Sequence, residues 1–144
     1  MSSRPLGTDL PGPLLRARRG RVIRAGAIAI GLLTAVALLF GTILVAQLLG
    51  SRSWRAEDPI SAGQHFAVNH RLNVVERWIA PFNLGVAAHG RGRWLEAAEY
   101  YGEADPLAPE DARCRILLNW SWALESAGDE AQRTGHSDQA MDHW

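Results

Sequence analysis

The chain has 144 residues, of which 47% are hydrophobic, and its formal net charge at pH 7 is zero. This neutrality averages two opposite parts: residues 1–24 carry six arginines against one aspartate, for +5, and residues 50–144 carry nine arginines against fourteen acidic residues, for −5. Nucleic-acid binding depends on many cationic contacts to phosphates, so this balance argues against a nucleic-acid partner.

The longest apolar run extends from Ala25 to Leu49 and contains no charged residue. At about 1.5 Å of rise per residue, a helix over this run is roughly 37 Å long, which exceeds the hydrocarbon core of about 30 Å. The run is also longer than the roughly 7–15 residues of a cleavable secretory signal. The pattern therefore favours an uncleaved transmembrane helix over residues 25–49, with an intact secretory signal as the alternative.

Arginine is concentrated on the N-terminal side of this run. Five arginines lie between residues 16 and 24, whereas Arg52 and Arg55 are the two that follow the run closely. The positive-inside rule then predicts a cytoplasmic, arginine-rich tail over residues 1–24 and an extracytoplasmic C-terminal part. The pattern from Leu14 to Arg24 allows the membrane helix to extend into this tail, and Trp54 fits an aromatic anchor at the membrane interface.

Small residues recur at intervals of four inside the predicted membrane helix, at Ala27, Gly31 and Ala35. A small-xxx-small face lets the backbone of another helix approach closely. We therefore consider helix–helix docking in the membrane, self-association included, with a plain lipid-facing surface as the alternative.

The remainder of the chain predicts helices and no strands, so the expected fold is all-α. A connector over residues 50–57 leads to Asp58, a helix N-cap residue, and Pro59, which suits the first helical position. This helix should run to about His70. The helical domain is expected over residues 58–128, and residues 129–144 are expected to form a flexible or partner-dependent tail.

The stretch from Trp78 to Pro109 resembles the tetratricopeptide repeat, a helical hairpin unit. Apolar residues from Trp94 to Ala104 recur at helical intervals, which independently predicts an amphipathic helix. In the family, the glycine of the Leu-Gly pair lets the second helix pack close to the first. The matching residues are Leu84, Gly85, Gly92, Trp94, Ala97, Tyr101, Ala104 and Pro109, whereas Pro81 and Ala88 depart from the family pattern.

A further helix should begin at Glu110 and Asp111, whose carboxylates favour a helix N-terminus, and run to Ala127, with Gly128 as its C-cap. Equating Gly128 with Gly92 gives a second, partial repeat unit offset by 36 residues, against 34 in the family. This helix has two apolar rows, which predicts burial between neighbours. Cys114, the single cysteine, lies on one of these rows and is expected to be a buried structural thiol, with a disulfide to another chain as the alternative.

No catalytic constellation is recognisable, so we expect no enzyme activity and no cofactor. The five histidines lack the spacing with cysteine or carboxylate that a zinc site requires, and no glycine-rich phosphate loop follows a strand. The acidic residues between Glu96 and Glu103 are typical of a solvated helix face.

The resemblance implies a binding surface, because the first helices of successive tetratricopeptide hairpins line a concave groove. Asparagine in such a groove can hold a peptide backbone, and arginine can pair with a carboxylate. The alternative is that Asn83 and Asn119 bond to neighbouring helix backbones. The residues that the resemblance places in the groove are Phe82, Asn83, Val86, Arg115, Asn119 and Trp122.

These features predict a single-pass membrane protein whose extracytoplasmic helices act as an adaptor for another membrane or envelope protein. All fifteen basic residues are arginine, which is typical of GC-rich bacterial genomes of the actinobacterial type. Such a protein is similar to the helical-repeat companions of von Willebrand A-domain membrane proteins, which implies a partner of that kind. The alternative function is a small accessory or structural subunit of a larger membrane complex.

Overall fold

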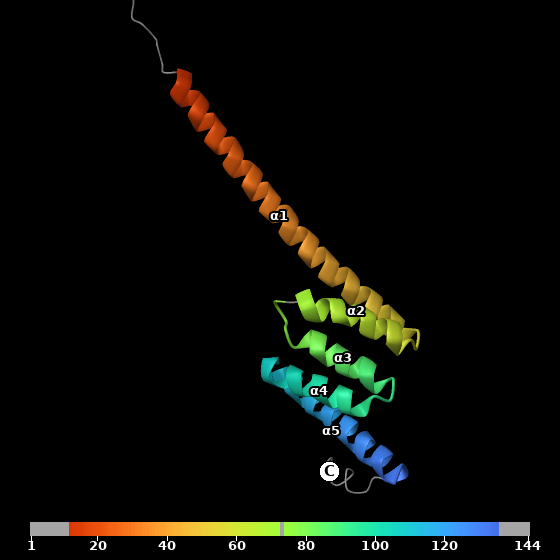
Figure 1. The fold of residues 1–144 in the computed structure, drawn as a ribbon. Helices are drawn as coiled ribbons and strands as arrows, with labels where there is room; N and C mark the ends of the chain where they lie inside the picture. The colour runs from red at the N-terminus through yellow and green to blue at the C-terminus, as the bar shows by residue number, and fades with distance from the viewer. Residues whose placement is uncertain (1–11, 73, 136–144) are drawn as a thin grey trace, which may run out of the picture. The chain divides into compact units, whose positions relative to one another are not determined.

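The computed structural model describes residues 12–72 and 74–135. This part of the chain forms helices and turns and contains no strand, so the predicted all-α class is confirmed (Figure 1). The first residues of the predicted cytoplasmic tail and residues 136–144 of the predicted C-terminal tail lie outside the described residues. The elements are α1 (Gly12–Arg55), α2 (Pro59–Leu72), α3 (Ile79–His89), α4 (Trp94–Ala104), the short 3-10 helix η1 (Asp105–Leu107) and α5 (Glu110–Arg133).

The chain divides after Phe40 into two units, which we describe separately. The first unit contains the N-terminal part of α1, whose large apolar side chains from Val22 to Phe40 are exposed, apart from the partly buried Leu39. Among the described helices, α1 is the one that is long and apolar enough to cross a membrane. It begins at Gly12, which agrees with the predicted extension of the membrane helix over residues 14–24.

The second unit contains the C-terminal turns of α1 together with α2 to α5. The predicted connector from Gly50 is wrong in its first part, because α1 continues to Arg55. Tertiary packing explains the difference: Ala46 and Gly50 are buried, and a Cβ atom on Gly50 would clash with the ring of Phe66 in α2. The local sequence around Gly50 does not predict this packing against α2.

The helix α2 begins as predicted. The backbone N–H of Ser61 donates to Asp58 Oδ1 at 3.0 Å, so Asp58 caps the helix and Pro59 occupies its first position. Hydrogen bonds from the side chain and backbone of Ser61 lower the pKa of the Asp58 carboxyl. The turn before it holds Glu57 at a φ of 58°.

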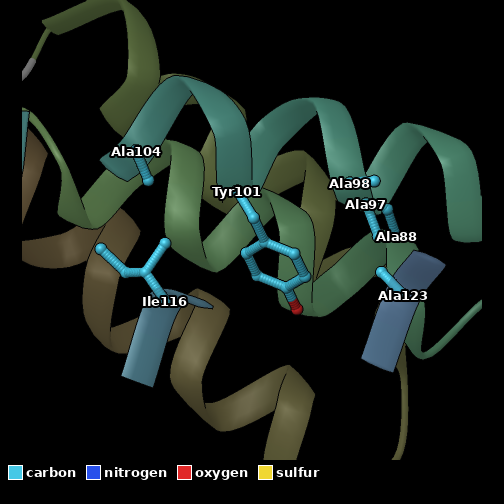
Figure 2. Close-up of a cluster of buried hydrophobic side chains, with 7 residues drawn as sticks. All are labelled: Ala88, Ala97, Ala98, Tyr101, Ala104, Ile116 and Ala123. Carbon is cyan, nitrogen blue, oxygen red and sulfur yellow. The ribbon is translucent and has the colours of Figure 1, made fainter. Parts of the chain in front are cut away.

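The helices α3 and α4 form the predicted hairpin, with Gly92 in its turn at a φ of 71°. Glycine is suited to this turn because positive φ strains other residues. The main core lies between α3, α4 and α5 and is built mostly from alanine around the fully buried Tyr101 and Ile116 (Figure 2). Small side chains let these helices approach closely. The fully buried members of this cluster are Ala88, Ala97, Tyr101, Ala104, Ile116 and Ala123, with Ala98 nearly so.

Two predictions about α5 are wrong. The helix does not end at Ala127: Gly128 is a buried helical residue, and α5 continues to Arg133 before Gly135 takes a φ of 81°. Residues 129–133 therefore belong to this helix rather than to a tail. The predicted second repeat unit required a turn at Gly128 equivalent to the turn at Gly92. Gly128 is helical, so that turn is absent.

Cys114 is exposed rather than buried. The apolar row of α5 that includes Ile116, Ala123 and Ala127 is buried, whereas on the other row Leu124 alone packs against the core cluster and is partly buried. The other row is largely exposed, because α5 packs against α4 on one side and is the last described helix of the chain. Leu117 and Leu118 on that second row are about half exposed.

Candidate functional site

A surface pocket of about 240 Å³ lies where side chains of four helices meet. Trp54 belongs to the end of α1, Val86 to α3, and Trp122 to α5. The Trp122 side chain is 50% exposed, so an aromatic ring forms part of an open rim. An apolar pocket with aromatic walls and few polar groups is typical of a binding site. Its lining residues are Trp54, Val86, His89, Gly90, Tyr101, Asn119 and Trp122.

Two buried polar atoms belong to residues that line this pocket. The Tyr101 hydroxyl and His89 Nδ1 have no hydrogen-bond partner within the described part of the chain. Burial raises the pKa of Tyr101 and lowers the pKa of His89, so both side chains are neutral at pH 7. A buried polar atom left unbonded costs about 1–3 kcal/mol, so these two atoms are an energetic cost of the packing around the pocket.

Two aromatic rings, Trp78 and Phe82, lie beneath Arg115 with an angle of 55° between their planes, and we call these three residues the aromatic–arginine cluster. The guanidinium carbon of Arg115 lies 5.7 Å from the ring centroid of Trp78 and 5.6 Å from that of Phe82, within the range of cation–π attraction. Phe82 precedes Val86 by four residues on α3, and Arg115 precedes Asn119 by four on α5. Residues four apart share a helix face, so the aromatic–arginine cluster and the pocket involve the same faces of α3 and α5.

The structure separates the two asparagines of the predicted groove. Asn119 lines the pocket, and its Nδ2 donates to the backbone oxygen of Arg115 in its own helix at 2.8 Å. Asn83 Nδ2 instead donates to Gln47 Oε1 in α1 at 3.3 Å. The same Gln47 oxygen accepts a hydrogen bond of 3.1 Å from Asn69 Nδ2, and Asn69 is only 3% exposed. Asn83 thus takes part in the contact between α1, α2 and α3.

Of the six predicted groove residues, Val86, Asn119 and Trp122 come together in the pocket, and Phe82 and Arg115 belong to the aromatic–arginine cluster. The sequence analysis missed Trp78, His89 and Tyr101 as members of this surface, and it gave Trp54 a different role, as a membrane-interface anchor. No sequence signal links Trp54 to Trp122, because both reach the same pocket only through the arrangement of the helices in the second unit.

Gln47 carries a sequence signal for this contact. It is the one amide side chain in the apolar run from Ala25 to Leu49. An unsatisfied amide in an apolar environment is unfavourable, so its position predicts a polar partner nearby. Asn69 and Asn83 supply that partner.

The small residues of the predicted membrane contact, Ala27, Gly31 and Ala35, are exposed in the first unit. A Cβ atom added to Gly31 would meet no neighbouring atom within 4 Å. This exposure is compatible both with a lipid-facing surface and with contact to another helix.

Within residues 12–72 and 74–135, no group of three His, Cys, Asp or Glu side chains lies close enough to hold a metal ion. No family model, curated protein or solved structure matches the chain. The class of this protein therefore follows from its fold and its pocket alone. The protein is an all-α protein with one N-terminal helix long and apolar enough to cross a membrane, followed by a helical unit with an aromatic-rimmed pocket.

Proposed function

We propose that the protein is a membrane-anchored adaptor whose tetratricopeptide-like helices bind a segment of another envelope protein. The observation that carries this proposal is the pocket between α1, α3 and α5, whose rim includes the half-exposed Trp122. Large, exposed aromatic side chains around a pocket are typical anchors of protein–protein contacts. The adjoining Arg115 offers a charge for a carboxylate of the partner.

Further support comes from the hairpin. Gly85 lies directly against the ring of Tyr101, and Ala97 and Ala104 are fully buried, which agrees with the packing roles of these positions in the tetratricopeptide pattern. Leu117 and Leu118 leave an exposed apolar row on α5, next to the pocket-lining Asn119. Repeat units normally bury such rows against a neighbour, which favours a protein partner.

The arginines before the membrane helix favour a cytoplasmic N-terminus, so the adaptor surface would be extracytoplasmic. A bacterial membrane protein with a von Willebrand A domain is the kind of partner that we propose first. No nucleic acid, cofactor or catalytic step is part of this function.

Site-specific photo-crosslinking in native membranes tests the proposal. A photoreactive amino acid replaces Trp122 in the full-length protein, and a matched control replaces Glu99, an exposed residue of α4. We expect a protein crosslink at position 122, absent at position 99, that weakens when Asn119→Ala is added. Equal crosslinking at both positions would contradict an adaptor surface between α3 and α5.

The second candidate is an accessory subunit held in a larger membrane complex by α1. The exposed face of Ala27, Gly31 and Ala35 favours it, because such a face allows close helix contact. Here Gly31→Leu would abolish co-purification of the complex, whereas Asn119→Ala and Trp122→Ala would leave it intact. The adaptor predicts the reverse pattern.

A further inference from the structure

The C-terminal turns of α1 have two different faces within the second unit. Ala46 and Gly50 are buried against the helical unit. Leu44, Val45 and Leu48 are exposed apolar residues, and they belong to the run that the sequence assigns to the membrane. The helices that follow α1 therefore pack against one face of its C-terminal turns, while the other face exposes apolar side chains that suit contact with lipid.

The contacts between α1 and α2 fix their register. Phe66 packs against Gly50, and Asn69 bonds to Gln47, so moving three residues forward along α2 corresponds to three residues backward along α1. This is an antiparallel arrangement. Continued by one turn, it brings Leu72, the last residue of α2, to the level of Leu44, inside the predicted membrane segment.

The end of α2 and the start of the following loop expose both apolar and charged side chains. Val74 and Val75 are 67% and 66% exposed, and Val68 is also exposed. Arg71 and Arg77 are exposed on either side of the valine pair, with Glu76 as the acidic neighbour. We define the α2–α3 patch as Val68, Arg71, Leu72, Val74, Val75 and Arg77.

A shallow apolar depression of about 420 Å³ adjoins the patch on α2 and is lined in part by Val68, Arg71 and Leu72. Arginine combines an apolar stem with a charged head, which suits a boundary between acyl chains and phosphate groups. Exposed apolar residues next to arginine are typical of surfaces that lie in the membrane interface.

We propose that the α2–α3 patch contacts the bilayer that α1 enters. Val74 and Val75 enter the boundary between headgroups and acyl chains, and Arg71 and Arg77 bind the phosphates of anionic glycerophospholipids. A bilayer is the occupant that the register favours, because the end of α2, where the patch begins, lies level with the exposed Leu44 of α1. The helical unit is thereby held against the membrane surface by a second contact. This inference does not depend on the adaptor function, since the pocket residues are not part of the patch.

An environment-sensitive fluorophore tests this contact in the full-length protein. Cys114→Ser removes the one native cysteine, and Val74→Cys then carries an NBD label. The protein is reconstituted in nanodiscs of phosphatidylcholine with a minority of phosphatidylglycerol. We expect a blue-shifted emission that is quenched by lipids carrying a doxyl group near the headgroup and protected from aqueous iodide.

The matched control is Glu125→Cys, an exposed position on α5, which should show unshifted emission and full quenching by iodide. Equal iodide quenching at positions 74 and 125 would overturn the proposal. Protection at position 74 in native membranes but not in nanodiscs that hold no other membrane protein would also overturn it, because another protein would then cover the patch. Arg71→Gln together with Arg77→Gln should reduce lipid quenching at position 74 in anionic nanodiscs.

Discussion

Gly85 in α3 and Tyr101 in α4 are packed so closely that a Cβ atom on Gly85 would lie 2.6 Å from Tyr101 Cε1. Tyr101 is fully buried, and its ring extends from α4 into the cluster of core side chains (Figure 2). The absence of a side chain at Gly85 therefore sets the distance between the two helices of the hairpin. The sequence pattern predicted this role for glycine in the Leu-Gly pair.

The Gly85→Ala substitution should destabilise the helical unit, because the added methyl group would force the buried ring of Tyr101 and the side chains packed around it to shift. We expect the free energy of unfolding to fall by about 1–3 kcal/mol, as is usual for overpacking. Denaturant titration of the full-length protein in detergent, followed by circular dichroism, measures this change. Gly102→Ala is the matched control: its Cβ would lie 3.2 Å from the half-buried Trp120, which can shift, so a much smaller loss is expected. Equal losses in the two variants would contradict the explanation.

Replacement of Gln47 by leucine should also destabilise the protein, although it makes the apolar run more hydrophobic. The substitution removes the oxygen that accepts hydrogen bonds from Asn69 and Asn83, and Asn69 is buried. The loss of partners for these amides should lower the free energy of unfolding by about 1–3 kcal/mol. Thr34→Leu, at an exposed site in the first unit, serves as the control and should leave the unfolding of the second unit unchanged. A Gln47→Leu variant as stable as the wild type would show that the bonds to Gln47 contribute nothing to stability.

The protein should lose stability as the pH falls below about 6.5, the ordinary pKa of histidine. Burial lowers the pKa of His89 in the folded state, so the unfolded chain binds the proton more readily in this range. The stabilisation is fully present above pH 6.5 and decreases as the pH approaches the lowered folded-state pKa. Thermal unfolding of wild type and His89→Gln between about pH 7.5 and pH 5 measures the effect.

The Gln variant should have the flatter pH profile, because it has no imidazole to protonate. Asp58 and Asp105 have folded-state pKa values below the ordinary 3.8, so their stabilisation is lost only at more acidic pH. Identical profiles for the two proteins between pH 7.5 and pH 5 would contradict the effect of His89 burial.

Cys114 offers a direct test of orientation. It is the single cysteine of the chain and it is exposed. With the N-terminus in the cytoplasm, Cys114 lies outside the cytoplasmic membrane. A maleimide that does not cross this membrane should then label Cys114 in cells whose cell wall has been permeabilised and whose cytoplasmic membrane is intact. Labelling that requires disruption of the cytoplasmic membrane would place the helical unit in the cytoplasm, against the prediction from the arginines. Cys114→Ser controls for labelling at other sites.

Local sequence signals predicted several elements correctly. Asp58 and Pro59 start α2, Gly92 forms the turn of the hairpin, and the apolar periodicity from Trp94 to Ala104 matches α4. Each of these features depends on residues within a few positions of one another. Caps, positive φ and amphipathic periodicity act over one or two helical turns, so they can be recognised without a tertiary structure.

The misjudged features depend on contacts between distant segments. Gly128 and Gly135 are equally plausible helix ends by composition, but Gly128 is buried and continues α5, whereas Gly135 takes positive φ. Cys114 lies on an apolar row as Ile116 does, yet only Ile116 faces the core. Whether another helix packs against a given face of α5 decides which of its residues are buried and where the helix ends.

The sequence by itself determined the apolar helix, the all-α class and the starts of α2 and α4, because hydropathy, capping and periodicity are local properties. Only the tertiary structure decided that α1 continues to Arg55, that Gln47 bonds to Asn69 and Asn83, and that Trp54 meets Trp122 in one pocket. The physical reason is that these features arise from packing between helices far apart in the chain. Small residues such as Gly50 and Gly85 allow that close approach, but their partners are fixed only when the helices come together.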